Sequence, residues 1–264
     1  KLENYHFNDI AEVLIQTDKE TRIHVYNLLG VEKTAKIFSF YENVEDYISE
    51  LPDEYAADVL EEMDSDDAVY VLNELEEEEK DKLIELLEED VQEQIKKIDS
   101  YDEDLIGSYM SDNFIVLPFT HSITTAMSTV IKKAGDCDNI FTLYIIDENQ
   151  KYMGVVSLKD LIISRKNDDF ANLIMTSFPF FYDDEVMSEC IERIKDYGEV
   201  SLPVLNRNLE LVGVVTSNDI IEVTEDEFEE DYAKFGGLTE EEEIDEPIRM
   251  SIRKRIPWLI TLLF

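Results

Sequence analysis

The sequence predicts a multidomain α+β protein, in which an all-helical N-terminal domain precedes a duplicated α/β unit. Helical periodicity without alternating strands extends from the first residues to about residue 105. Short β-branched runs separated by helical stretches follow, and they recur at a fixed spacing. A strongly acidic stretch then changes abruptly into a basic and apolar one. These changes of pattern divide the chain into its expected domains.

The first expected domain, residues 1–107, has the pattern of a succession of short helices. The periodicity is interrupted near Gly30, Pro52 and Asp64. Between the interruptions, apolar side chains fall on one face of each helix, as in Asp66–Leu72 after a helix cap at Asp64. Short helices that each bury one face favour a stacked, superhelical array.

The next part of the chain contains an internal duplication. Each copy has the pattern of a strand, a turn, a second strand and a helix. The copies align at a constant offset of 59 positions, with Gly154 matching Gly213 and Ser157 matching Thr216. An acid follows each hydroxyl residue after three positions, as a capping box at the start of a helix requires. The aligned segments are 141–147 with 154–162, and 200–206 with 213–221.

The charge reverses after the second copy. Residues 222–246 hold 13 carboxylates and the single base Lys234. Residues 248–264 hold four bases and no acid, and they include Trp258 in an apolar run shorter than the ~20 residues that span a bilayer. We expect a segment beside the membrane, followed by a membrane helix that is cut short, with the cationic side in the cytosol.

Composition excludes several classes of function. The 63 acidic residues against 23 basic ones give a net charge of −40, which opposes nucleic acid as a partner. Cys137 and Cys190 form no CxxC pair, so a zinc site has little support. No secretory signal is evident, which fits the cytosol. We expect no enzyme, because nucleophile elbow, triad, Walker and Rossmann patterns are missing.

The duplicated segments resemble tandem CBS (cystathionine-β-synthase-type) modules. The signature of that family is a hydrophobic strand, a Gly-hydrophobic-hydrophobic-Ser/Thr-x-x-Asp turn and a helix, and both copies carry it. The pairs Met110-Ser111 and Met175-Thr176 fit the two openings. The resemblance implies a CBS domain over 108–168 and another over 169–228, packed together as one unit.

The order of the parts resembles the MgtE family of magnesium transporters and channels. An acidic helical domain, two CBS copies, an acid-rich linker and the sequence Arg253–Leu259 leading into membrane follow one another as in that family. The resemblance implies a homodimer through the CBS domains at the cytoplasmic face of the membrane. It also implies an acidic linker and long connecting "plug" helix over 229–256, the start of a transmembrane helix at 257–264, and a separate transmembrane pore domain.

The family's Mg²⁺ ligands imply a set of metal-binding positions in this chain. Asp196 stands near Gly198, where the family has an acid, and it is included as a substitute. Two further family acids fall on Lys36 and Tyr70, which cannot replace them. The expected metal ligands are Asp66, Asp196, Asp219, Glu222, Glu227, Glu230 and Asp231.

Elementary electrostatics supports a role for magnesium. Two unit charges ~4 Å apart at an effective dielectric of ~20 repel by about 4 kcal/mol. Mg²⁺ prefers oxygen ligands and keeps several waters, so weak sites shared between domains would draw acidic surfaces together. Two alternatives remain open. One is an adenine-nucleotide (ATP) sensor using Lys159 and Asp160, where Asp160 otherwise serves as a helix cap. The other is an acidic helical scaffold for a basic partner.

Overall fold

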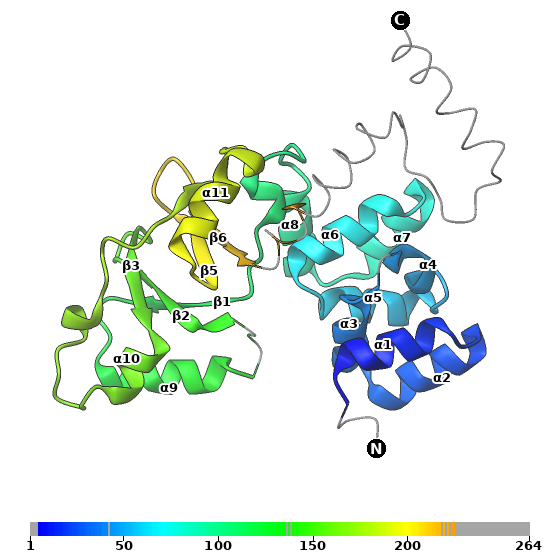
Figure 1. The fold of residues 1–264 in the computed structure, drawn as a ribbon, viewed down its shortest axis with the longest axis horizontal. Coiled ribbons are helices and arrows are strands. Elements are labelled where there is room, and N and C mark those ends of the chain that lie inside the picture. Colours follow the sequence, from blue (N-terminus) through cyan, green and yellow to red (C-terminus); the bar gives the residue numbers. More distant parts are fainter. Residues whose placement is uncertain are drawn as a thin grey trace, which may run out of the picture.

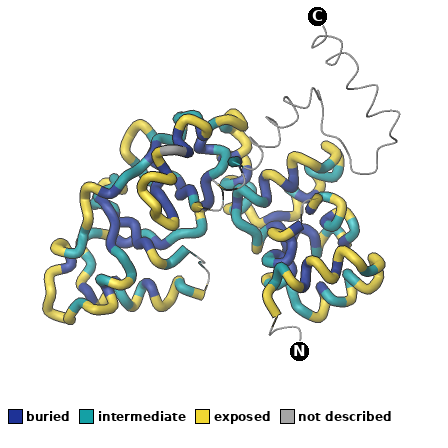
Figure 2. Tube along the Cα trace, in the orientation of Figure 1, coloured by how far each residue is buried: buried dark blue, intermediate teal, exposed yellow. Residues whose placement is uncertain are grey.

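The computed structural model describes residues 5–224 except residues 42, 136, 138, 218, 220 and 222. The first helices gather in one lobe, and the strands gather in another with the helices of the repeat, while α8 (Glu89–Ile98) lies at the junction (Figure 1). Figure 2 shows buried residues inside both lobes. The expected α+β architecture, with helices first and the α/β repeat second, is confirmed.

In the described residues, eight short helices form the first lobe. Their lengths run from five residues in α4 (Val44–Ile48) to 11 in α2 (Lys19–Leu29). Gly30 ends α2 with a φ of 85°, a left-handed conformation that glycine adopts without strain. Pro52 and Asp64 occupy the N-cap positions of α5 and α6. The helices are α1 (Phe7–Ile15), α2 (Lys19–Leu29), α3 (Val31–Phe38), α4 (Val44–Ile48), α5 (Asp53–Glu61), α6 (Ser65–Glu74), α7 (Glu77–Leu86) and α8 (Glu89–Ile98).

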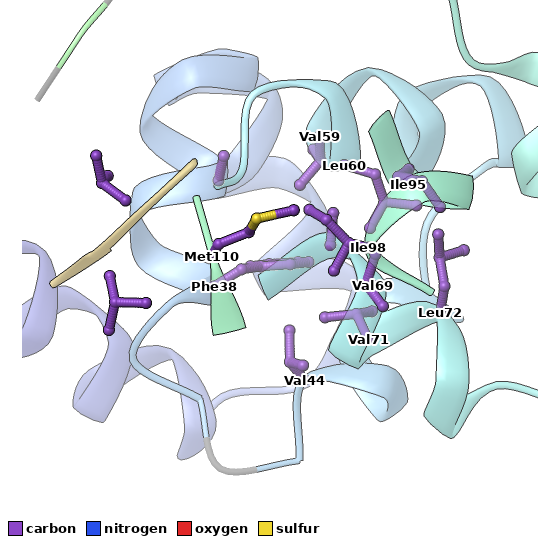
Figure 3. Packing of buried hydrophobic residues seen from close by; sticks show 14 of the residues in the cluster. Phe38, Val44, Val59, Leu60, Val69, Val71, Leu72, Ile95, Ile98 and Met110 are labelled. Carbon is purple, nitrogen blue, oxygen red and sulfur yellow. The ribbon is translucent and has the colours of Figure 1, made fainter. Parts of the chain in front are cut away.

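The helices stack in a regular order. Helix α1 packs on α3, α3 on α5, α5 on α7 and α6 on α8, as in a superhelical array. Phe38, Val59, Leu72 and Ile95 are almost completely buried where these helices meet (Figure 3). Met110, from the segment that follows the helices, joins the same core (Figure 3). The helical lobe and the α/β lobe therefore share hydrophobic packing.

The second lobe contains two three-stranded sheets of the same topology. In each sheet a parallel pair is followed by an antiparallel pair, in the order β1-β2-β3 and β4-β5-β6. The equivalent strands and helices confirm the duplication that the 59-residue offset predicts. The elements are β1 (Phe114–Pro118), α9 (Ile123–Lys133), β2 (Asn139–Ile146), β3 (Tyr152–Ser157), α10 (Leu158–Ile163), β4 (Phe181–Tyr182), α11 (Met187–Tyr197), β5 (Ser201–Leu205) and β6 (Leu211–Thr216), with short 3-10 turns η2 (Ile106–Tyr109) and η3 (Phe170–Leu173).

The two copies are fastened together by exchanged backbone pairs. Ser111, which precedes the first sheet, pairs with Val214 of β6, and Met175, which precedes the second, pairs with Val155 of β3. A Cβ on Gly154 would lie 2.3 Å from the Met175 carbonyl oxygen, so this crossing needs a glycine. The buried Tyr144 hydroxyl lies 2.8 Å from the Ser201 hydroxyl and links β2 to β5. The copies thus pack as one unit.

The helical lobe is attached to the second copy of the repeat by α8 and η2. Gly107 donates its N–H to the carbonyl of Asp183, whose carboxylate accepts a hydrogen bond from the Tyr101 hydroxyl at 2.9 Å. The Lys97 ammonium donates to the carbonyl of Val212 on β6 at 2.9 Å. We call these contacts the α8 latch. Across the described residues, no helix combines the length and apolarity needed to cross a bilayer. The expected connecting helix and membrane segment, residues 229–264, lie outside them.

Candidate functional site

A cavity of about 470 Å³ lies between the helical lobe and the two copies of the repeat, and we call it the interdomain cleft. One wall comes from α1, α3 and the start of α6, and the other comes from the strand ends of the repeat. Acidic side chains from both walls meet in it. The lining residues are Phe7, Lys36, Ser39, Phe40, Asp64, Asp66, Asp67, Ser111, Asn113, Asn139, Phe141, Val200, Thr216, Ser217 and Asp219.

The helical wall of the cleft is acidic because α6 begins there. Asp64 is the N-cap of this helix, and Asp66 and Asp67 lie in its first turn, where negative charge is favoured by the helix dipole. The Oδ1 atom of Asp66 is buried and has no hydrogen-bond partner. Burial, together with the charges of Asp219, Asp67 and Asp64, raises the pKa of Asp66 well above its ordinary value. Asp66 is therefore a buried acceptor without a compensating positive charge or donor at Oδ1.

The opposite wall contributes Asp219, which follows β6. Its carboxylate accepts hydrogen bonds from the N–H and hydroxyl of Thr216, both at 2.6 Å. Burial and the charge of Asp64 nevertheless raise the pKa of Asp219 to about 6, because they outweigh these hydrogen bonds. The first copy shows the reciprocal half of the capping box, since Ser157 Oγ accepts from the N–H of Asp160 at 3.1 Å. The capping pattern is thus confirmed, one half in each copy.

Polar contacts hold the two walls together around the acids. Asp64 accepts a hydrogen bond at 2.7 Å from the side-chain amide of Asn113, and the Ser65 hydroxyl donates to Asp112. A second cavity of about 250 Å³ adjoins the first, and Asp66, Asp67 and Asp219 line both. It adds the acids Glu74 and Glu103. The acids shared by both cavities are therefore accessible from two sides.

The structure brings together two of the predicted metal ligands, Asp66 and Asp219. Asp196 is exposed in the last turn of α11 and does not line the cleft. Tyr70, a position where the family has an acid, lines the second cavity. The predicted ligands Glu222, Glu227, Glu230 and Asp231 lie outside the described residues.

The candidate nucleotide residues lie elsewhere. Lys159 is exposed and Asp160 is half-buried, both in the first turns of α10, and neither lines the interdomain cleft. Sequence reasoning also missed part of the acidic wall. It assigned Asp64 only as a cap and did not select Asp67, although an Asp-x-Asp-Asp run at a helix start was visible. Glu74 and Glu103 carried no comparable signal.

The oxygen atoms that could ligate a metal in the cleft fit a hydrated Mg²⁺ ion. They are carboxylate, amide and hydroxyl oxygens, the hard ligands that Mg²⁺ prefers, and the orphaned Asp66 Oδ1 offers an open lone pair. Within the described part of the chain, no group of three or more His, Cys, Asp or Glu side chains is arranged to enclose a metal. Mg²⁺ retains several waters and needs only one or two carboxylates, so a closed cage is unnecessary.

The structure combines a stacked helical domain with a duplicated α/β unit, and the two meet at an acidic cleft. Residues 5–104 match the MgtE intracellular N domain, and residues 106–166 and 170–226 match the CBS domain. The chain belongs to the MgtE family, since it carries that family's N domain followed by paired CBS domains.

Similar proteins agree with this assignment. The magnesium transporter MgtE of Enterococcus faecalis is 37% identical over 263 residues, which are 98% of this chain and 58% of the relative. MgtE of Bacillus subtilis is 31% identical over 64% of this chain and 38% of its own length. The chain therefore spans less than two thirds of these relatives.

Two solved structures share the fold over 84% of this chain. The soluble part of a magnesium transporter superposes with a TM-score of 0.80 at 29% identity, with 89% of that structure covered. The cytosolic domain of the Mg²⁺ channel MgtE in complex with ATP has a TM-score of 0.77 at 25% identity, with 92% covered.

Proposed function

We propose that this chain is the cytosolic Mg²⁺-sensing region of a magnesium transporter or channel. The observation that carries the proposal is the position of Asp66 and Asp219, which come from different domains and line one cleft, where the buried Oδ1 atom of Asp66 has no hydrogen-bond partner. Asp66 and Asp219 would hold the ion, with Asp64 and Asp67 beside them. A bound Mg²⁺ would supply positive charge and a shell of ordered water donors.

The mechanism rests on the balance of charge across the cleft. When Mg²⁺ is scarce, the carboxylates of α6 and Asp219 repel each other, which favours separation of the helical domain from the CBS pair. When the charge is compensated, Asp66 and Asp219 can remain close in the closed arrangement. Because the closed form holds more ions than the open one, rising Mg²⁺ shifts the population toward closure.

We further propose that closure reaches a transmembrane pore domain through residues 229–256 and shuts the pore. This step follows the MgtE family, whose members in Enterococcus faecalis and Bacillus subtilis are named magnesium transporters. A homodimer formed through the CBS domains belongs to the same proposal. Its support is an apolar face on α9 and α10, where Ile131, Ile162 and Ile163 are all more than 60% exposed.

Small-angle scattering and limited proteolysis across an Mg²⁺ titration test the proposal, with Na⁺ series matched for ionic strength. We expect compaction with Mg²⁺ in the wild type and none in Asp66→Asn or Asp219→Asn. Asp160→Asn is the matched control, because this aspartate occupies the equivalent place in the first copy and does not line the cleft. Superimposable profiles in Mg²⁺ and Na⁺, or equal compaction in all three variants, would remove the proposal. Light scattering of Ile162→Asp tests the dimer, which this change should dissociate.

A second candidate ligand is an adenine nucleotide near Lys159 and Asp160. It is favoured by the related cytosolic domain that was solved in complex with ATP. Calorimetry with ATP on Lys159→Ala and Asp66→Asn separates this role from the first. A nucleotide site at α10 predicts loss of ATP binding in Lys159→Ala alone, whereas unchanged ATP binding in Lys159→Ala excludes it there.

A further inference from the structure

A basic side chain lies at the acidic cleft. Among the described residues that line the interdomain cleft, Lys36 is the only base, and four aspartates line the same cavity. It lies in the last turn of α3, and its side chain is 37% exposed. Its ammonium is 3.4 Å from a carboxylate oxygen of Glu32 on the same helix, an exposed ion pair that stabilises little.

The end of α3 is held against the acidic wall. The hydroxyl of Ser39, the C-cap residue of this helix, donates to the Asp67 carboxylate at 3.3 Å. Lys36 lies one turn before Ser39, so its flexible stem starts from a helix end that is fixed beside α6. Lys36 therefore lines the same cleft as the carboxylates that would attract a free cation.

Lys36 compensates this charge only in part. Four aspartates and one ammonium leave three negative charges at full ionisation. The buried Oδ1 atom of Asp66 has no hydrogen-bond partner even with Lys36 in place, so this base does not satisfy the carboxylate. The Lys36 ammonium and a free divalent cation would consequently be attracted by the same carboxylates.

We infer that Lys36 is a built-in competitor cation that lowers the affinity of the interdomain cleft for divalent metal ions. The inference rests on the proposed function, and it adds a residue that sets the Mg²⁺ concentration at which the cleft fills. Because the ammonium repels a second cation placed among the aspartates, its removal should tighten binding. At a separation of roughly 8 Å and a dielectric between those of water and protein, one charge changes the affinity for a divalent ion about five- to tenfold or more.

Calorimetric titration with Mg²⁺ at fixed ionic strength tests the inference. We expect Lys36→Gln to bind Mg²⁺ about five- to tenfold more tightly than the wild type, and Lys36→Glu to bind more tightly still. Lys33→Gln is the matched control, since Lys33 lies on α3 but does not line the cleft. It should change the affinity less than about twofold, through net charge alone.

Two further variants separate the inference from the proposal beneath it. In Lys36→Gln/Asp219→Asn the gain should disappear, because the carboxylate that holds the ion is removed. If Asp219→Asn abolishes binding while Lys36→Gln equals the wild type or binds more weakly, the role of Lys36 is wrong and the cleft remains the sensor. If Lys33→Gln tightens binding as much as Lys36→Gln, the effect is not local and the inference also fails. If neither Asp66→Asn nor Asp219→Asn alters Mg²⁺ binding, the proposed function itself fails.

Discussion

Replacing Asp219 with Asn isolates the electrostatic strain that the interdomain cleft stores without metal. The amide oxygen of Asn can still accept the hydrogen bond from the Thr216 N–H, so the local turn should survive. The negative charge, however, is removed from a buried position beside the α6 aspartates. The substitution therefore changes charge with little change in shape.

The raised pKa sets the size of the effect. A shift from 3.8 to about 6 corresponds to at most ~3 kcal/mol at neutral pH, at ~1.4 kcal/mol per unit. Opening of the cleft relieves the same strain, so the observed value should be smaller. For a chain of this size ~1 kcal/mol moves the melting temperature by about 2–4 °C. We expect Asp219→Asn to melt several degrees above the wild type in metal-free buffer at pH 7.5.

The stability difference between the wild type and Asp219→Asn should depend on pH. An acid whose pKa is raised by folding contributes full stability below its unfolded pKa, and that contribution is lost as pH rises through the folded value of about 6. The two proteins should therefore differ little below about pH 4, and the difference should grow up to about pH 6 and stay constant above about pH 7. Differential scanning calorimetry at about pH 4 and at pH 7.5, with and without Mg²⁺, measures this.

Asp160→Asn is the control for this experiment, because Asp160 occupies the equivalent place in the first copy and does not line the cleft. It should leave the melting temperature and its Mg²⁺ response nearly unchanged. The reasoning would be refuted if Asp219→Asn lowered the melting temperature in metal-free buffer at pH 7.5. It would also be refuted if the variant kept the full stabilisation by Mg²⁺.

Three other predictions concern proton coupling, the repeat and the helical core. Mg²⁺ affinity should fall as pH drops below about 6, with proton release that calorimetry in two buffers of different ionisation enthalpy detects, because protons compete for the raised-pKa acids. Gly154→Ala should lower the free energy of unfolding by more than ~2 kcal/mol in denaturant titrations, because the added Cβ would strike the Met175 carbonyl and because residue 154 has a φ of 148°. Gly135→Ala is the control and should not lower it, because nothing lies within 4 Å of the added Cβ. Arg22→Met should lower the free energy of unfolding by about 3 kcal/mol in the same assay, because it leaves the Glu50 carboxylate without its ion-pair partner. The side chains of Arg22 and Glu50 are only 11% and 18% exposed, and unchanged stability would contradict the prediction.

Local patterns made the fold predictable. The interruptions at Gly30, Pro52 and Asp64 mark helix boundaries because each residue type restricts the backbone in a definite way, and all three occur as predicted. The duplication was equally accessible, since a repeated sequence must bury equivalent faces. The exchange of backbone pairs between the copies was not, because it depends on the distant partners Ser111 with Val214 and Met175 with Val155.

The site was predictable only in part. Asp66 and Asp219 are far apart in the sequence, and the resemblance to MgtE selected them, whereas spacing alone gave no reason to pair them. Asp64 carries an ordinary capping signal, and its contact with Asn113 arises only when the domains dock. Periodicity reports which face of an element is buried, but it does not report which charges from other elements share a cavity.

The distribution of contacts between the lobes predicts where the protein would bend during the proposed opening of the cleft. At the α8 latch, backbone groups of η2 and the packed helix end bind the second sheet, and Met110 joins the helical core. At the cleft, the attachments described above are side-chain contacts, such as Ser65 with Asp112, next to carboxylates that repel. The weaker side should open first, so the helical lobe should pivot about the latch.

Hydrogen exchange with and without Mg²⁺ tests this pivot. Amides at the start of α6 and after β6 should gain protection when Mg²⁺ is added, because closure shields them. The amides of Ile106 and Gly107, which donate to carbonyls of the second copy, should exchange at the same rate in both conditions. Loss of protection across the latch in metal-free buffer would mean that the lobes separate completely, and the electrostatic strain at the cleft would then act on the whole interface rather than about a hinge.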